Sequence, residues 1–309
     1  MEYIYRTFNG RDEEQIIPLW NRCMVRDIIT TERFHKQVLL DENFDSAGCQ
    51  VALAGERIVG FCLGIRRRYP YYDLGLEKDK GWITMLFVDQ DHRRNGIATE
   101  LVTRCERFLR NAGVERVQVS PYVPNYFIPG VDIDAYADAY SLFEKLGYAT
   151  VEKIYGMERS LLDFYPDGEM ERKCQRLEKQ GVCIKKFHPR YIVSLLEFLR
   201  RDYPGDLFRV ALEKLKRSIE SNEIYIAVKG DDVVGFSHFE GDHFGPFAIA
   251  QAYMGRGIGP CLYYRTALAM KEEGQRYLWL AWTTGHVKDF YHKLGLTTIR
   301  RHEIMEKIL

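Results

Sequence analysis

Residues 89–99, with the sequence DQDHRRNGIAT, place two arginines, an asparagine and a glycine directly before an amphipathic run that predicts a helix. The first N–H groups of a helix have no intrahelical partner, and the helix dipole gives them partial positive charge. Gly96 leaves these amides open because it has no side chain, while Arg93 and Arg94 add charged donors. The stretch therefore predicts a phosphate site, and a simple helix cap with solvated arginines is the alternative.

A second copy of this pattern, AQAYMGRGIG, occupies residues 250–259 and again joins an apolar run to a helical one. Neither copy contains G-x-x-x-x-G-K-[ST], so a Walker-type nucleotide site is not supported. The GRGIG of the second copy is too short for the G-x-G-x-x-G of dinucleotide-binding folds. The sequence thus indicates two turns of another kind, both suited to an anion.

The length and composition favour two soluble domains. The chain has 309 residues, about twice the usual length of one domain. Lys plus Arg equals Asp plus Glu at 44 each, so no overall positive charge favours nucleic acid. The seven cysteines are scattered without a C-x-x-C pair, and the N-terminus lacks the apolar core of a signal peptide. We expect a cytoplasmic protein that binds no nucleic acid, membrane or metal.

The order of predicted elements occurs twice along the chain. In the first half, predicted strands and helices alternate over residues 3–10, 12–24, 49–65, 81–88, 96–112, 115–120, 135–147 and 149–161. Hairpin, glycine turn, helix, strand and final helix then recur in the same order after residue 181, which indicates duplication of a whole domain. We predict an α/β fold with mixed sheets in two tandem domains, 1–160 and 181–309, joined by an exposed linker at 161–180.

The first copy carries thirteen residues that the second lacks, the loop 122–134 with the sequence YVPNYFIPGVDID. A long loop between a strand and a helix is typical of a binding element. We therefore list Tyr126, Phe127 and Asp132 as candidate substrate contacts. The alternative is that Tyr126 and Phe127 only cover the edge of the core.

The order strand, R-x-x-G-x-A, helix, strand and F-E-K-L-G-Y resembles the GNAT superfamily of N-acetyltransferases. Arg93, Gly96 and Ala98 match its acetyl-CoA motif, [QR]-x-x-G-x-[GA]. The late signature FYEKLGF of the family has counterparts in LFEKLGY at 142–148 and FYHKLGL at 290–296. The resemblance covers nearly the whole chain, and the protein is similar to the tandem members with two acetyltransferase folds.

The second copy departs from the family motif in its turn. Gly257 and Gly259 match, but Met254 stands where Gln or Arg is usual. Backbone amides carry most of the phosphate contact, so both turns stay candidates for the cofactor.

The resemblance implies acetyl-CoA or another short acyl-CoA as cofactor, with the pyrophosphate on the amides of the turn and the pantetheine arm beside the preceding strand. A free N–H on that strand can stabilise the oxyanion while an amine attacks the thioester directly. The implied cofactor-binding residues are Leu86, Phe87, Val88, Arg93, Arg94, Asn95, Gly96, Ile97, Ala98 and Thr99 in the first copy, and Ile249, Gly255, Arg256, Gly257, Ile258 and Gly259 in the second.

In the family, the tyrosine of the late signature protonates the leaving thiolate. The second copy has this residue as Tyr291, whereas the first has Phe143, so Tyr136 and Tyr140 are its substitute candidates for the general acid. A core aromatic is the alternative for each of them. Candidate general bases are Asp132, Asp134, Glu240 and Asp242, with solvated loop carboxylates or a water chain as the alternatives.

These features together predict an acetyl-CoA-dependent N-acetyltransferase that modifies the primary amine of a small molecule, as a monomer or homodimer. The first copy is favoured for cofactor binding because its motif is complete. Two alternatives stay open. One is an acyl-CoA sensor without turnover, favoured by Phe143 and Met254. The other is a peptide or protein N-acetyltransferase.

Overall fold

The structure is a computed structural model that describes residues 2–219 and 223–309. It contains two compact units. Unit 1 is Met1–Tyr71, Gly75–Ile154 and Arg300–Leu309, and unit 2 is Tyr72–Leu74 and Tyr155–Ile299. The expected ranges 1–160 and 181–309 differ from these units mainly at residues 300–309, because the end of the chain pairs with strands of unit 1.

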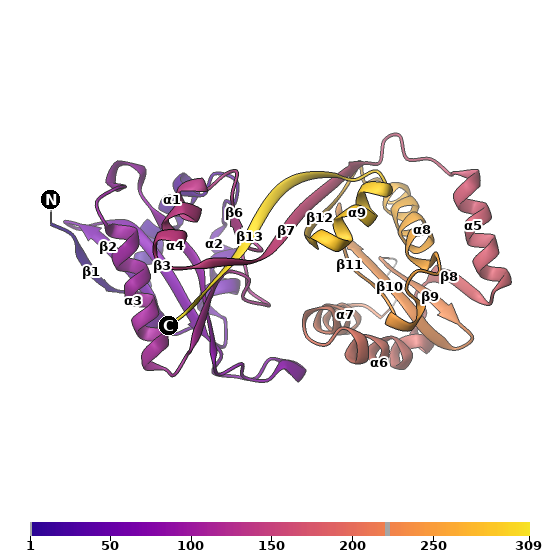
Figure 1. Cartoon of the computed structure of the whole chain (residues 1–309), viewed down its shortest axis with the longest axis horizontal. Helices are drawn as coiled ribbons and strands as arrows, with labels where there is room; N and C mark the ends of the chain where they lie inside the picture. The colour runs from indigo at the N-terminus through magenta and orange to yellow at the C-terminus, as the bar shows by residue number, and fades with distance from the viewer. Residues whose placement is uncertain (1, 220–222) are drawn as a thin grey trace. The chain divides into compact units, whose positions relative to one another are not determined.

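Unit 1 is built on a mixed sheet (Figure 1). Its strands are β1 (Ile4–Thr7), β2 (Cys49–Ala54), β3 (Arg57–Arg66), β4 (Lys80–Val88), β5 (Arg116–Val119), β6 (Val131–Asp132), the start of β7 (Ala149–Ser160) and most of β13 (Thr297–Ile308). Strands β1 to β4 form an antiparallel meander, β5 lies parallel to β4, and β13 pairs antiparallel with β5. Its helices are α1 (Glu13–Cys23), the single turn α2 (Thr31–Phe34), α3 (Ile97–Asn111) and α4 (Ala137–Lys145).

The sheet of unit 1 is covered on both faces, which explains its nearly continuous apolar strands. Trp20 of α1 packs with Phe61 and Phe87 in one hydrophobic cluster. Leu101 of α3 and Phe143 of α4 belong to a separate cluster with Ile83, Val59 and Cys62. Successive residues of β3 therefore contribute to different cores, as the side-chain alternation of a strand requires.

Strand β4 loses its partner halfway along its length. Its pairing with β5 runs from Lys80 to Ile83, where Ile83 pairs with Val119, and continues no further among the described residues. Beside this point a bulge in the β3–β4 pairing leaves Thr84 as the extra residue between Ile83 and Met85. Residues 84–88 thus keep β3 on one side and have an open edge on the other.

Unit 2 repeats the order of elements. Its strands are the end of β7, β8 (Val182–Lys186), β9 (Ile224–Lys229), β10 (Asp232–Glu240), β11 (His243–Ile249) and β12 (Tyr277–Thr284), and its helices are α5 (Gly168–Lys179), α6 (Ile192–Asp202), α7 (Asp206–Arg217), α8 (Ile258–Glu272) and α9 (Gly285–Lys293). Strands β8 to β11 are antiparallel, and β12 meets β11 in the parallel sense at Trp279 and His243.

The segment 161–180 is a packed part of unit 2, and the expectation of an exposed linker is wrong. Residues Gly168–Lys179 form α5, whose Cys174 and Leu177 are buried in the core of the unit. Glu171 accepts two hydrogen bonds at 2.9 Å from the guanidinium of Arg265 on α8. The helix forms because Met170, Cys174 and Leu177 recur at helical spacing within an otherwise charged run.

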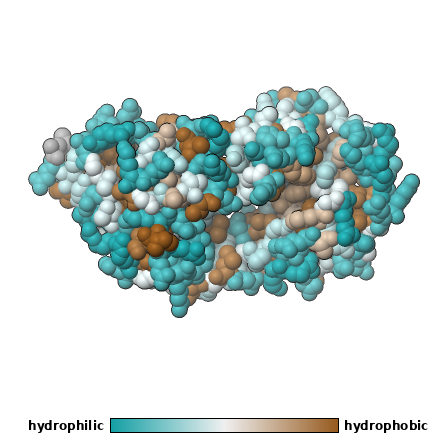
Figure 2. Space-filling model, viewed as in Figure 1, coloured by the Kyte–Doolittle hydropathy of each residue, from teal (hydrophilic) through white to brown (hydrophobic). Residues whose placement is uncertain are grey.

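The face shown in Figure 2 is mostly hydrophilic, with hydrophobic residues in separate patches. In the described part of the chain, none of the helices combines the length and the apolar character that crossing a bilayer requires.

Candidate active site

The turn between β4 and α3 has the open backbone that the sequence predicts. Gly96 is the N-cap of α3 with φ 79°, a left-handed conformation that favours glycine. A Cβ built on Gly96 meets no atom within 4 Å, so the space above the turn is empty. The amides of Ile97, Ala98 and Thr99 lie in the first helical turn, where helices have no acceptor of their own.

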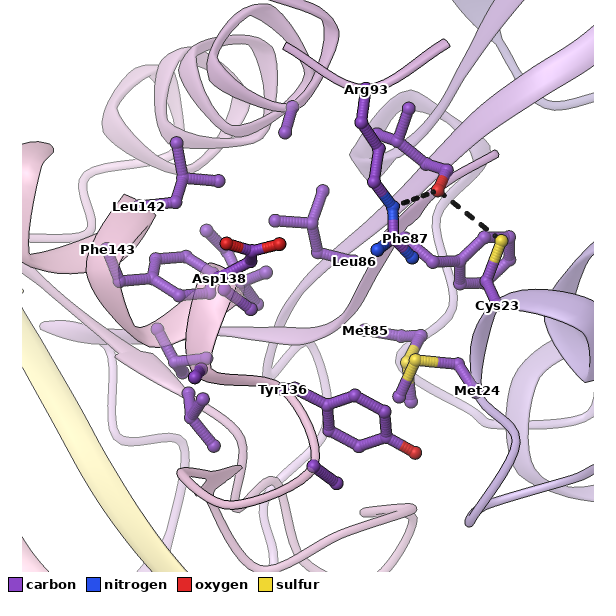
Figure 3. Close-up of a pocket in the computed structure, with 18 of the residues that line it drawn as sticks. Cys23, Met24, Met85, Leu86, Phe87, Arg93, Tyr136, Asp138, Leu142 and Phe143 are labelled. Carbon is purple, nitrogen blue, oxygen red and sulfur yellow. Dashed lines mark hydrogen bonds between the residues drawn. The ribbon is translucent and has the colours of Figure 1, made fainter. Parts of the chain in front are cut away.

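The two arginines of the turn have different surroundings. The Nε of Arg93 donates to the carbonyl of Val88 at 3.1 Å, and the same carbonyl accepts from the Cys23 thiol at 3.4 Å (Figure 3). Arg94 donates to Asp138 at the start of α4 at 2.6 Å, and both side chains of this ion pair are exposed. The Arg93 side chain is thus hydrogen-bonded to β4, whereas the Arg94 side chain is exposed to solvent next to the turn.

A cavity of about 810 Å³ continues from this turn along the open edge of β4 (Figure 3). The predicted residues that line it are Leu86, Phe87, Val88, Arg93, Arg94, Gly96, Ile97, Ala98, Thr99 and Tyr136. Asn95 does not line it, because its side chain turns back and donates to the carbonyls of His92 and Arg93. The far wall includes Ser120, Met24 and Asp134, which the cofactor motif does not mark.

The two candidate acids of unit 1 occupy different environments. Tyr136 lines the cavity, and its hydroxyl donates to Asp27 at 2.6 Å. Tyr140 does not line the cavity, and its hydroxyl lies 3.4 Å from Thr150 Oγ1. Phe143 lines the cavity at the position of the family tyrosine.

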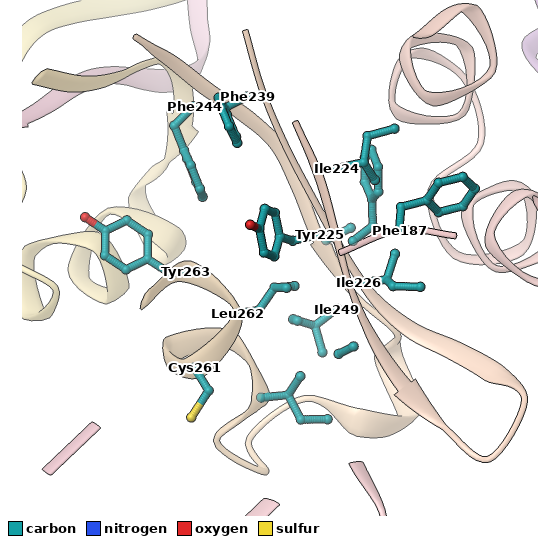
Figure 4. Packing of buried hydrophobic residues seen from close by; sticks show 14 of the residues in the cluster. Phe187, Ile224, Tyr225, Ile226, Phe239, Phe244, Ile249, Cys261, Leu262 and Tyr263 are labelled. Carbon is teal, nitrogen blue, oxygen red and sulfur yellow. The ribbon is translucent and has the colours of Figure 1, made fainter. Parts of the chain in front are cut away.

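Tyr291 is a core residue of unit 2. Its ring contacts those of Phe244, Phe290 and Tyr263, and burial raises the pKa of its phenol. Figure 4 shows Phe244 and Tyr263 within this hydrophobic cluster. The alternative of a core aromatic describes Tyr291 better than the role of a general acid.

The loop 122–134 lines the cavity through Ile128, Gly130, Val131 and Asp134, whereas its three expected substrate contacts do not line it. Phe127 is buried with its ring 4.7 Å from that of Trp20, and Tyr126 is half-buried without lining the cavity. Asp132 is fully buried and accepts from the amides of Asp134 and Ala135 at 3.0 and 2.9 Å. These contacts fix the entry to α4, so the environment of Asp132 does not fit a substrate contact or a base that meets substrate directly. Of the other candidate bases, Asp134 lines the cavity, and Asp242 accepts from the Trp279 indole.

The turn of unit 2 keeps the same backbone but has less room beside it. Gly255 and Gly257 have φ of 75° and 83°, and Gly257 is the N-cap of α8. The rings of Phe247 on β11 and Phe290 on α9 stack 6.0 Å apart, and a Cβ on Gly259 would meet Phe290 at 3.4 Å. Ile249 and Ile258 are buried in the core of the unit, whereas Arg256 is exposed in the turn, with its guanidinium 5.0 Å from the ring centroid of Tyr253.

Equivalent positions in the two units carry different side chains. When the two turns are aligned on Gly96 and Gly257, Leu86 of unit 1 corresponds to Phe247. When the two late signatures are aligned, Leu142 corresponds to Phe290. Leu86 and Leu142 line the cavity of unit 1, whereas the two phenylalanines stack on each other between β11 and α9.

Asp27 and Arg300 support the cavity through Tyr136 without lining it, and neither was marked by the sequence. Asp27 follows α1, and Arg300 comes from β13, far along the chain. The Arg300 guanidinium donates to both carboxylate oxygens of Asp27, at 2.6 and 2.8 Å. Neither residue belongs to a local motif, so only long-range pairing brings them together. Among the described residues, no cluster of His, Cys, Asp or Glu is arranged to hold a metal ion.

Comparison with known proteins agrees with this geometry. Residues 12–148 match the model of the acetyltransferase (GNAT) family. The fold of 99% of the chain is similar to the glucosamine N-acetyltransferase region of a fungal multi-domain GH3 β-N-acetylglucosaminidase, with TM-score 0.81 and 18% identity; the chain spans 38% of that protein. No curated protein matches the sequence closely enough to be reported.

Two further solved structures are similar over 99% of the chain. One is a GCN5-related N-acetyltransferase from Sphaerobacter thermophilus, with TM-score 0.71, 18% identity and 95% of that chain covered. The other is a tandem GNAT protein from the clavulanic acid biosynthesis pathway, with TM-score 0.58, 13% identity and 98% covered. The predicted fold class is confirmed, and the match to the GNAT family model falls on residues 12–148, which lie within unit 1 except for Tyr72–Leu74.

Proposed function

We propose that the protein is an acetyl-CoA-dependent N-acetyltransferase that acts on a small amine and that unit 1 performs the reaction. The observation that carries this proposal is the continuity of the Gly96 turn with the cavity along the open edge of β4. A turn of free amides suits a pyrophosphate, and an open strand edge suits an extended amide-containing arm. Both requirements of an acyl-CoA are therefore met in one place.

The residues of unit 1 have distinct tasks in this reaction. The amides after Gly96 hold the diphosphate, and Arg94 adds a charged donor beside it. Backbone groups of residues 84–88 orient the thioester, and a free N–H among them stabilises the developing oxyanion. The apolar cavity wall, which includes Met85 and Leu86, limits access of water to the thioester.

Direct attack by the amine fits this site because Cys23, the cysteine that lines the cavity, is already hydrogen-bonded to Val88 and has a raised pKa, owing mainly to burial. A raised pKa makes a thiol a poor nucleophile. The leaving group is a thiolate, and because thiols are far more acidic than alcohols or amines, it can leave without a proton donor and then take a proton from solvent. Turnover therefore does not require a phenol at Phe143.

The second unit is proposed as a scaffold without bound cofactor. Its turn is intact, but Phe247 and Phe290 occupy the place where the cavity of unit 1 lies beside Leu86 and Leu142. An acyl-CoA sensor without turnover is the second candidate, and Phe143 at the family tyrosine position is the observation that favours it.

The test is release of free thiol from acetyl-CoA in the presence of a panel of amines. The panel contains glucosamine, because that acceptor is named for the fungal relative, together with spermidine, phenethylamine, an aminoglycoside and a short peptide with a free N-terminus. We expect release with one or more of the small amines and one CoA bound per chain. No release with any amine, despite CoA binding, would identify a sensor. Release with the peptide alone would identify a peptide modifier.

A further inference from the structure

The hydroxyl of Tyr136 already donates its proton in a hydrogen bond to Asp27. Tyr136 stands just before α4, where its amide donates to the carbonyl of Asp132 at 2.9 Å. Its ring lines the cavity, and its hydroxyl points away from Phe143 (Figure 3). That hydroxyl donates to Asp27 Oδ2 at 2.6 Å, a short distance typical of a bond to a carboxylate.

Asp27 is held in place from three directions. Its own backbone carbonyl accepts from the Trp20 indole at 2.9 Å, and its amide donates to the carbonyl of Met24 at 2.9 Å. Its carboxylate receives the fork of Arg300, whose Nε also donates to Asp132 at 2.8 Å. The side chain of Asp27 is only 9% exposed. The pair of Tyr136 and Asp27 is therefore fixed before any substrate enters.

This geometry sets the direction in which a proton can move. A phenol that donates to a carboxylate does not offer the same proton to a leaving thiolate, so Tyr136 is poorly placed for the role of general acid. Burial and the hydrogen bond to Asp27 both raise the pKa of Tyr136, which further weakens it as an acid. Its oxygen also accepts a hydrogen bond from the Arg26 backbone, which leaves one lone pair that can accept from a group in the cavity.

We propose that Tyr136 and Asp27 form the proton-accepting pair of the reaction, with Arg300 as the residue that positions Asp27. The amine nitrogen forms a bond to the thioester carbon while the carbon–sulfur bond breaks and its electron pair stays with sulfur. The nitrogen loses one proton to Tyr136 Oη, and Tyr136 passes its own proton to Asp27 Oδ2. The inference rests on the proposed function and adds the base that the sequence left open.

The first test compares Tyr136→Phe, Asp27→Asn and Tyr140→Phe. Tyr140→Phe is the matched control, because that phenol lies outside the cavity. With acetyl-CoA and the panel amine that turns over fastest, Tyr136→Phe and Asp27→Asn each lower kcat by about 100-fold, the usual contribution of general acid–base catalysis. The dissociation constant of CoA and the kcat of Tyr140→Phe stay at the wild-type values.

The double variant Tyr136→Phe, Asp27→Asn shows whether the two residues act as one relay. A relay is broken by either change, so the double variant is no slower than the slower single one. Losses that multiply in the double variant contradict the relay. A Tyr136→Phe enzyme with wild-type kcat overturns the inference while leaving the proposed function intact. Wild-type protein that releases no thiol overturns both.

The positioning role of Arg300 is tested by measuring kcat and the dissociation constant of CoA for two variants, since a positioning residue changes only kcat. Arg300→Lys keeps a charge but lacks the planar fork, so it restores part of the kcat that Arg300→Gln loses. Arg300 lies in β13, so its replacement could disturb the fold of unit 1. An unchanged affinity of both variants for CoA shows that the unit is still folded. Equal activity of the Gln variant and the wild type contradicts the positioning role.

Discussion

The two glycine turns offer a matched pair of substitutions, Gly96→Ala and Gly257→Ala. Both glycines are N-caps in the left-handed region, with φ of 79° and 83°, and neither Cβ would meet an atom within 4 Å. An alanine in this backbone conformation costs about 1–2 kcal/mol. The two variants should therefore lose similar amounts of the free energy of unfolding, which separates stability from binding.

Only Gly96→Ala should weaken the binding of CoA. The added methyl group enters the empty space above the amides of unit 1, where the diphosphate is proposed to lie. Loss of one charge-assisted hydrogen bond costs about 1.5–3 kcal/mol, which corresponds to about ten- to a hundredfold in the dissociation constant. Gly257→Ala should leave CoA affinity unchanged, because Phe247 and Phe290 already fill the neighbouring space of unit 2.

Isothermal titration of each variant with CoA, beside denaturant unfolding of the same preparations, measures both quantities. We expect one CoA per chain for the wild type and for Gly257→Ala. The assignment of the cofactor to unit 1 would be refuted by two CoA per chain, or by a Gly257→Ala variant that binds as weakly as Gly96→Ala.

Three other predictions concern separate features. Asp138→Asn frees Arg94 from an exposed ion pair worth about 0.2–1 kcal/mol, so CoA should bind up to about fivefold tighter at low salt. In titrations of the Arg94→Gln variant, adding Asp138→Asn should not increase the affinity for CoA. Burial lowers the pKa of His238 to about 4 from 6.5. Between pH 6.5 and 4 the unfolded state therefore binds more protons than the folded state, and the free energy of unfolding should fall by about 3 kcal/mol over this range. The prediction is contradicted if the free energy of unfolding of His238→Asn falls with pH as steeply as that of the wild type. Leu177→Ala should destabilise unit 2 by about 2–4 kcal/mol in urea unfolding because α5 is packed, whereas a solvated linker would change little.

The features that the sequence predicted well are local ones. The strand, the open turn at Gly96 and the helix follow one another in the chain, so apolar periodicity and a glycine suffice to place them. The repeat of the element order was visible for the same reason. The packing of α5 was missed because most of its residues are charged, although Cys174 and Leu177 show the spacing of a buried face.

The features that the sequence left unresolved depend on distant parts of the chain. Nothing local to Arg300 indicates that it meets Asp27, because the register of β13 beside β6 decides which of its side chains lie near Asp27. The role of Tyr291 was ambiguous because the motif FYHKLGL at 290–296 does not indicate whether the tyrosine ring faces a cavity or the core. An alignment of the two copies pairs Leu86 with Phe247, and this larger side chain would have indicated that unit 2 has less room for a cofactor.

The membership of residues 300–309 in unit 1 has a consequence for synthesis. Strand β5 receives its β13 partner from the end of the chain, about 155 residues after the rest of the unit. A ribosome that adds about 5–20 residues per second needs on the order of 10–30 s to make that stretch. During this time the nascent unit presents an unpaired strand edge, which is a template for pairing with other chains. Unit 1 is thus completed only after unit 2 has been synthesised, and its protection during translation depends on how soon β13 arrives.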